Sequence, residues 1–180
     1  MEIIKNWIMN VKQKLGIIDF YEYWEYRKQL LIKKGLVCGE NVHILCTHVE
    51  AKYASIISIG DNVTITNSTV LAHDGSTKKP FGYSKIGGVT IGNNSFIGYG
   101  SIILPGTIIE DNCIIGAGSV VRGHIPSDSL VIGNPAQIVG SASEFLEKNK
   151  KRLEEYGIVD IRSTDGLEKF RSCGNWGFEI

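Results

Sequence analysis

The sequence lacks the cysteine patterns that mark zinc and disulfide proteins. Its 180 residues contain four cysteines, which are widely scattered and form no CxxC pair: Cys38, Cys46, Cys113 and Cys173. This spacing is not that of a zinc ribbon, and it offers no obvious disulfide framework. Scattered free thiols suit a reducing compartment, so we expect a cytoplasmic protein.

Long hydrophobic runs and an excess of one charge are also absent. No run is long enough to span a bilayer, and Glu2, Lys5 and Lys12 interrupt the first residues in a way that is not typical of a secretory signal. Basic and acidic residues number 19 each, so the chain as a whole has no long-range attraction for nucleic acid or anionic lipid. We therefore expect no nucleic-acid partner and no membrane span. A content of 43% hydrophobic residues predicts one globular domain with its own core.

Residues 1–36 have the pattern of helices. Apolar residues recur at spacings of three and four from Ile3 to Leu15, and the pattern resumes after Gly16 from Phe20 to Leu31. This spacing predicts two helices. With lysines on the opposite face, such a helix could lie on a membrane surface. The interpretation we favour is that both helices cap the open end of the body and pack on it.

From about residue 37 to residue 140 the helical period gives way to a repeat of six residues. Branched aliphatic side chains stand at every sixth position: Ile59, Ile65, Leu71, and again Ile91, Ile97, Ile103, Ile109, Ile115, Val121. Glycine or asparagine follows three positions later, where the positive φ of a sharp turn is tolerated: Asn62, Asn94, Gly100, Gly106, Asn112, Gly118. An antiparallel sandwich would instead alternate every second residue, with irregular turns. The repeat predicts a solenoid of short strands, each of which adds one inward aliphatic residue.

Two segments interrupt the repeat. A weaker coil from Cys38 to Ile44 precedes the first break, which ends at Ile59. The second break, at about residues 72–89, is polar and basic and lies between blocks that are in register. We therefore expect it to leave the stack as a loop, and loops on rigid scaffolds often carry binding and catalysis.

A C-terminal segment of residues 141–180 follows the solenoid. Ser141 or Ser143 is expected to cap a helix that ends at Gly157. No structure is predicted for the tail from Ile158 onward, which could dock on a neighbouring subunit.

Residues 89–139 carry a family likeness. The IGNN and IEDN turns, PGT, GAGSVV and GNPA occur in the order and spacing of the hexapeptide-repeat acetyltransferases, which the chain resembles from about residue 57 to residue 139. That family includes galactoside, maltose and antibiotic acetyltransferases and many bacterial glycan O-acetyltransferases. The resemblance implies a mainly β fold, a left-handed parallel β-helix, assembled as a homotrimer with acetyl-CoA in a groove between subunits. Handedness does not follow from the repeat itself.

Acetyl transfer from a thioester to a hydroxyl needs a group that removes the hydroxyl proton, and histidine suits this because its unperturbed pKa of about 6.5 lies near working pH. His73 matches the family's catalytic histidine, at the point where the solenoid gives way to the loop. Its alternative role is to hydrogen-bond the root of the loop. Asp74 either orients His73 or pins the loop. His124 could line the CoA groove, whereas His43 and His48 are expected at the surface.

The resemblance also implies positions that contact the cofactor. Tyr99 and Ala117, eighteen residues apart and hence expected on successive coils, match residues beside the pantetheine arm in relatives. Arg122 matches a segment near the adenine and the phosphates, which an arginine can bind in a bidentate manner. Gln137, just after GNPA, occupies a position that is often basic. Ordinary surface packing is the alternative for Tyr99 and Arg122.

The donor that stabilises negative charge on the thioester oxygen stays unassigned. No asparagine aligns with the family between Cys46 and Tyr53, and Asn67 is available but is expected to form a turn.

Two other functions can use the same scaffold. A γ-type carbonic anhydrase needs three histidines around zinc, and no close pair follows His73 in the loop, so we expect no metal. A non-catalytic solenoid would keep the aliphatic repeat without His73. The sequence thus predicts an O-acetyltransferase that acts on a sugar or a glycan precursor in surface polysaccharide biosynthesis, with an antibiotic or another small molecule as the alternative acceptor.

Overall fold

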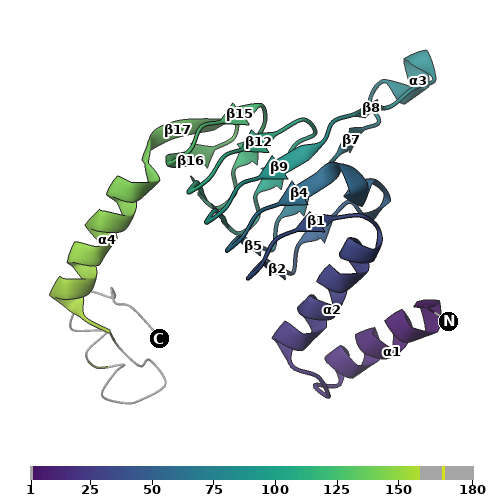
Figure 1. The fold of residues 1–180 in the computed structure, drawn as a ribbon, viewed down its shortest axis with the longest axis horizontal. Coiled ribbons are helices and arrows are strands. Elements are labelled where there is room, and N and C mark those ends of the chain that lie inside the picture. The colour runs from purple at the N-terminus through teal and green to yellow at the C-terminus, as the bar shows by residue number, and fades with distance from the viewer. Residues whose placement is uncertain (1, 159–167, 169–180) are drawn as a thin grey trace. The chain divides into compact units, whose positions relative to one another are not determined.

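A computed structural model of the chain describes residues 2–158 and residue 168. Residues up to Val139 form one compact unit and the chain from Gly140 forms a second, so the two are described separately. The first unit consists of two helices followed by a prism of short parallel strands (Figure 1). In the described part of the chain, no helix is both long and apolar enough to cross a membrane.

The two helices predicted at the N-terminus are present. Helix α1 spans Glu2–Lys14 and helix α2 spans Phe20–Lys33. The Asp19 carboxylate caps α2 by accepting hydrogen bonds from the backbone amides of Tyr21 and Glu22. Helix α2 packs on the first coil of the prism, where Lys28 Nζ donates to the carbonyl of Val42 at 2.8 Å. The expected packing on the body is thus correct for α2. Helix α1 contacts α2 through Asn6 and Asn10, and its apolar side chains, among them Ile4, Trp7 and Leu15, are exposed.

Three sheets form the three faces of the prism. The first sheet contains, in spatial order, β1 (Val37–Cys38), β4 (Ile57–Ile59), β9 (Val89–Ile91), β12 (Ile108–Ile109) and β15 (His124–Ile125). The second contains β2 (His43–Leu45), β5 (Thr64–Thr66), β10 (Phe96–Ile97), β13 (Ile114–Ile115), β16 (Ser129–Gly133) and β17 (Ala136–Ser141). The third contains β3 (His48–Val49), β6 (Thr69–Val70), β11 (Ile102–Ile103) and β14 (Val120–Val121). Strands of successive coils pair in parallel, as for β10 with β13.

The core confirms the six-residue repeat from Ile91 onward. The inward aliphatic residues Ile91, Ile97, Ile103, Ile109, Ile115 and Val121 are almost completely buried. Each such side chain stabilises the stack by roughly 1.5 to 3 kcal/mol relative to its exposed state. These residues form one continuous cluster that reaches back to Leu36.

One position of the repeat is corrected by the structure. Val70, at 0% exposure, occupies the inward position that the repeat assigns to Leu71, and it pairs with Ile103 of the next coil. The turn around Asn67 is one residue shorter than the turn around Gly100, so the inward residue that follows Ile65 comes after five residues instead of six.

The prism has three corners, and two of them are important here. The asparagine corner joins the first sheet to the second and carries a column of asparagines with positive φ: Asn41, Asn62, Asn94, Asn112. The loop corner joins the third sheet to the first and comprises residues 50–56, 71–88, 104–107 and 122–123. The glycines and asparagines predicted at turns have φ between 54° and 80°, for example Asn94 at 54° and Gly106 at 80°.

Both interruptions of the repeat lie at the loop corner. The first is the 3-10 helix η1 (Ala51–Ile56), whereas β3, which precedes it, stays in the stack. The second is an antiparallel hairpin of β7 (His73–Asp74) and β8 (Lys85–Ile86), with the short helix α3 (Lys78–Phe81) at its tip (Figure 1). Because of this hairpin, equivalent residues of the second and third coils are 32 residues apart, compared with 18 in the following pair of coils.

The second unit contains the predicted C-terminal helix. Helix α4 spans Ala142–Tyr156, and the Ser141 hydroxyl caps it by accepting from the backbone amide of Glu144 at 3.2 Å. The helix ends at Gly157, whose φ is 69°. Ser141 is therefore the capping residue, rather than Ser143. The predicted tail lies outside the described residues, except for residues 158 and 168.

Candidate active site

An open groove of about 750 Å³ runs along the loop corner. The root of the hairpin forms one wall, and residues 104–106 and 122–123 of the two following coils form the other. It is larger than the two pockets beneath α2, of about 150 and 390 Å³. Gly87 brings the returning strand of the hairpin so close to this wall that a Cβ there would lie 2.6 Å from the amide nitrogen of Gly106.

His73 stands at the rim of this groove, at the start of the hairpin. Its side chain is 36% exposed, and its Nδ1 atom is buried against the Glu50 carboxylate. The imidazole stacks on the ring of Tyr53, with 5.1 Å between ring centroids and 26° between planes. One nitrogen and one face of the imidazole are thus held by η1 and the residue before it, which leaves Nε2 for proton transfer.

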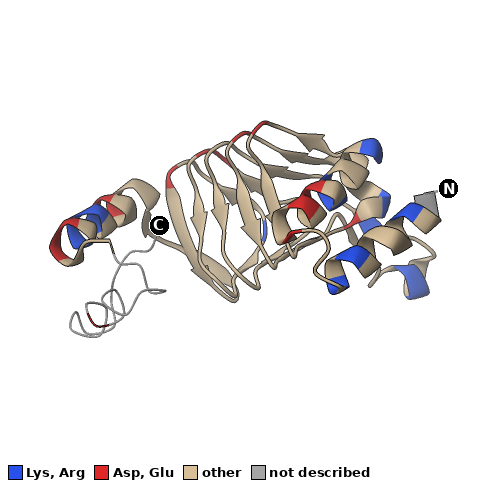
Figure 2. Cartoon of the chain, turned by 90° about the horizontal axis from the view of Figure 1, so that it is seen from below, with Lys and Arg blue, Asp and Glu red and all other residues tan. Residues whose placement is uncertain are grey.

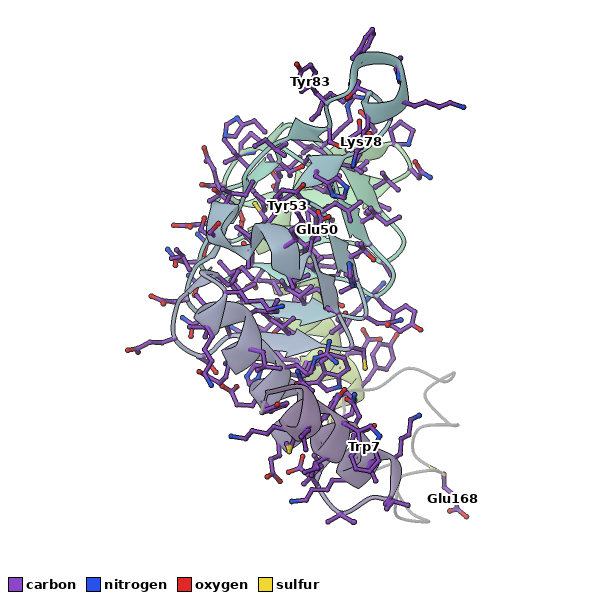
Figure 3. All side chains as sticks on the ribbon, turned by 90° about the vertical axis from the view of Figure 1, so that its right-hand side faces the viewer. Trp7, Glu50, Tyr53, Lys78, Tyr83 and Glu168 are labelled. Atoms are coloured by element: carbon purple, nitrogen blue, oxygen red, sulfur yellow. The ribbon has the colours of Figure 1, made fainter. Side chains whose placement is uncertain are left out.

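Glu50 is fixed by the backbone of the segment that it supports. Its side chain is 13% exposed, and Oε2 accepts hydrogen bonds from the amides of Ala72 at 3.0 Å and of His73 at 3.1 Å. The other oxygen, Oε1, lies against His73 Nδ1. A partly buried carboxylate so placed can orient an imidazole and stabilise its protonated form. Figure 3 shows Glu50 and Tyr53 close together below the hairpin that carries Lys78 and Tyr83.

Glu50 was not among the predicted site residues. The six-residue repeat breaks after Ile44 in the sequence, whereas in the structure β3 pairs Val49 with Val70 and so places Glu50 beside the root of the hairpin. The five-residue step from Ile44 to Val49, the same as in the next coil, was the available signal.

Asp74 has a different set of contacts from His73. Its carboxylate pairs with Lys85 Nζ at 2.6 Å and accepts from the amide of Ser76 at 2.8 Å. The hydrogen bond from Lys85 holds the pKa of Asp74 well below its usual range. These contacts join the two strands of the hairpin, so they support the pinning role. The catalytic role of Asp74 stays a prediction.

The predicted cofactor residues lie at more than one place in the chain. Arg122 lines the same groove as His73, and it forms no ion pair with any other described residue. Tyr99 and Ala117 lie on successive coils at the third corner, between the second and third sheets, where the amide of Gly118 donates to the carbonyl of Tyr99 at 2.8 Å. Within one chain, Arg122 therefore lies in the same groove as His73, whereas Tyr99 and Ala117 lie at a different corner of the prism.

The remaining candidates lie away from the groove. Gln137 is exposed on β17. His124 pairs through Nε2 with Glu110 at 2.7 Å on the outer side of the first sheet. Asn67 forms a turn, as expected, with a φ of 40°. Over residues 2–158 and 168, no three histidine, cysteine or acidic side chains are grouped so that they could hold a metal ion.

The comparisons with known proteins agree with this architecture. The family model "Bacterial transferase hexapeptide (six repeats)" matches residues 84–123. A prism built from six-residue steps is the architecture of the hexapeptide-repeat acetyltransferases, and this chain belongs to that family. Its fold is accordingly the left-handed parallel β-helix that the resemblance implied, and its class is that of the acetyltransferases.

Particular relatives share most of the chain. "Putative acetyltransferase YvoF" of Bacillus subtilis (strain 168) is 30% identical over 155 residues, which cover 86% of each chain. The crystal structure of a maltose O-acetyltransferase from Clostridium difficile 630 matches with a TM-score of 0.53 and 25% identity, over 77% of this chain and 87% of that one. The acetyl-CoA complex of the hexapeptide-repeat acetyltransferase VCA0836 from Vibrio cholerae O1 biovar eltor matches with a TM-score of 0.53 and 24% identity, over 61% of each chain.

Proposed function

We propose that this enzyme transfers the acetyl group of acetyl-CoA to a hydroxyl of a sugar or a glycan precursor, with His73 as the general base. The observation that carries this proposal is the imidazole at the rim of the groove, held through Nδ1 by Glu50. The similarity to a maltose O-acetyltransferase supports a carbohydrate hydroxyl as acceptor. The similarity to a protein with bound acetyl-CoA supports the donor.

The proposed reaction needs one proton carrier. The acceptor hydroxyl oxygen attacks the carbonyl carbon of the thioester while His73 Nε2 takes the hydroxyl proton. The new C–O bond forms, the C–S bond breaks, and the imidazolium returns the proton to the sulfur of CoA. Glu50 stabilises the imidazolium during the interval in which it carries this proton. The products are the acetyl ester and CoA with a free thiol.

The positions of the cofactor candidates support an assembly of several chains. Arg122, unpaired in the groove, can bind a CoA phosphate. Tyr99 and Ala117 lie at another corner of the same chain, so they reach this groove only from a neighbouring subunit. We therefore include a homotrimer in the proposal, with Tyr99, Ala117 and Gln137 of one subunit completing the CoA groove of the next.

The proposed location is the cytoplasm, where acetyl-CoA and the precursors of surface polysaccharides would both be available. The free thiols of Cys38, Cys46 and Cys113 suit this reducing compartment.

The test is a screen of sugars, nucleotide sugars and aminoglycoside antibiotics with acetyl-CoA, following release of the CoA thiol. Turnover with a sugar hydroxyl is the expected result, and the variant His73→Ala should lower kcat by roughly 100-fold or more. The matched control is His43→Ala, because His43 is an exposed histidine on β2. Unchanged turnover in His73→Ala would remove this histidine from the mechanism, and turnover with antibiotics alone would overturn the proposed acceptor.

A further inference from the structure

Helix α1 turns a polar face toward the rest of the protein. Asn6 accepts a hydrogen bond from the hydroxyl of Tyr26 at 2.9 Å, and Asn10 accepts one from the hydroxyl of Tyr23 at 2.7 Å. Both tyrosines belong to α2, so the contact between the two helices is made in part by hydrogen bonds. An amphipathic helix usually packs its apolar face on its own protein, and α1 does the opposite.

The apolar face of α1 is exposed as a result. Ile4, Trp7, Ile8 and Leu15 follow the three- and four-residue spacing of one helix face, and Ile4, Trp7 and Leu15 are 63%, 65% and 67% exposed. Exposed apolar side chains continue beyond the helix with Ile17, Phe20 and Tyr21. Figure 3 shows the side chain of Trp7 on α1, at the end of the unit far from the hairpin. Large apolar side chains gathered on one face indicate an interaction surface.

The charges on this segment all have one sign. Residues 3–18 contain Lys5, Lys12 and Lys14 and no acidic residue, although the whole chain has a net charge of zero. The helical period places Lys5 and Lys12 on one flank of the apolar face and Lys14 on the other. None of the three forms an ion pair within residues 2–158 and 168. Figure 2 shows basic residues as blue bands on α1. Lysines beside an exposed apolar face can bind lipid phosphates while the face enters the bilayer.

We propose that α1 docks this enzyme on an anionic lipid bilayer, with the helix lying in the plane of the interface. Its 13 residues are too few to span a membrane but sufficient for an interfacial helix. A second copy of the chain fits the surface less well, because two such faces packed together would bring six lysines into proximity with only one acidic residue, Glu2, on each helix. This inference rests on α1 alone and does not depend on the proposed acetyl transfer.

Flotation of the full-length protein with lipid vesicles tests the proposal. Vesicles of equal parts phosphatidylglycerol and phosphatidylcholine should bind the protein at least about tenfold more strongly than vesicles of phosphatidylcholine alone. Half-molar salt should weaken the binding, since it shortens the range of the lysine charges. The variant K5Q/K12Q/K14Q should lose at least about tenfold in binding to the anionic vesicles, and Trp7→Ser should lose about as much because it removes the largest apolar side chain of the face.

Matched controls come from elsewhere in the chain. K148Q/K150Q/K151Q removes three exposed lysines from α4, and Phe81→Ser removes an aromatic side chain that is exposed as much as Trp7. Both controls should bind vesicles like the unchanged protein. Because all the substituted side chains are exposed, thermal unfolding should stay the same in every variant.

Three results would overturn the proposal. The first is equal binding to neutral and anionic vesicles, or no binding to either. The second is a loss with the α4 lysine variant that equals the loss with the α1 variant. The third is a fall in molecular mass of Trp7→Ser in solution without vesicles, measured by light scattering, which would show that a second copy covers this face.

Discussion

The asparagine corner and the loop corner belong to the same prism but differ in regularity. At the asparagine corner, side-chain amides of successive coils are linked at 3.0, 3.1 and 3.2 Å, from Asn41 through Asn62 and Asn94 to Asn112. Figure 2 shows acidic residues repeated along the turns at one edge of the prism. At the loop corner, η1 and the hairpin replace the tight turn in two successive coils. The regular corner thus suits a role in stability, and the interrupted corner is where the proposed chemistry lies.

The largest expected difference between the two corners is in kcat, when one glutamate of each corner is replaced by glutamine. Glu50→Gln should lower kcat by about 10- to 100-fold, because the amide cannot stabilise the imidazolium of His73 as a carboxylate does. KM for acetyl-CoA should stay the same, since Glu50 lies outside the proposed CoA contacts. Steady-state kinetics with the acceptor found in the screen would measure both. Glu40→Gln, at an exposed glutamate of the asparagine corner, is the control. An equal loss of kcat in both variants would contradict the assignment of roles.

The next effect concerns stability at the regular corner. Asn94 has a φ of 54° and links Asn62 to Asn112, so Asn94→Ala should lower the free energy of unfolding by about 1–2 kcal/mol. Asn94→Gly should lower it less, because glycine adopts positive φ without steric cost. Chemical denaturation would give both values, and kcat should stay unchanged. A large loss of kcat without loss of stability would show that this corner takes part in catalysis.

A smaller effect is expected for Asp74, which joins the strands of the hairpin. Asp74→Asn should change kcat by no more than about threefold, because the pair with Lys85 is exposed and such pairs contribute little. A loss of kcat as large as that of Glu50→Gln would instead support the catalytic role predicted for Asp74. The same kinetic assay decides between the two.

The smallest effect is a dependence of stability on pH at the regular corner. Hydrogen bonds from Ser127 and then the contact with His124 lower the pKa of Glu110 from 4.5 to about 2. The stability that the Glu110 carboxylate contributes is therefore present above pH 4.5 and is lost as pH falls toward about 2. Thermal unfolding should show Glu110→Gln less stable than the unchanged protein at pH 7, with the difference disappearing at acid pH. A difference that persists at acid pH would argue against this linkage.

The regular part of the fold was predictable because its strands repeat without change. From Ile91 to Val121 every inward residue follows the last by six, so the sequence alone identifies the core. Two steps, those that end at Val49 and at Val70, are five residues long, and their length depends on turn geometry. A strict count of six therefore predicted Leu71 as the inward residue instead of Val70.

The site was predictable only in part. The resemblance to a family motif singled out His73, whose catalytic role stays a prediction, whereas the place of Glu50 depends on the register between the first and second coils, which an irregular turn hides. Periodicity likewise revealed that α1 has an apolar face. Periodicity could not reveal which face of α1 would contact α2, because this contact depends on the hydrogen bonds that Asn6 and Asn10 of α1 accept from tyrosines of α2.

The hairpin of residues 73–86 also indicates how such enzymes can diversify. Strands β4 and β9 pair in full register across an excursion that leaves the stack and returns at Gly87. The length and content of the excursion are thus free to vary between lineages while the wall that supports His73 stays the same. New acceptor preferences can arise by exchanging residues 75–84 alone, which leaves His73 in place.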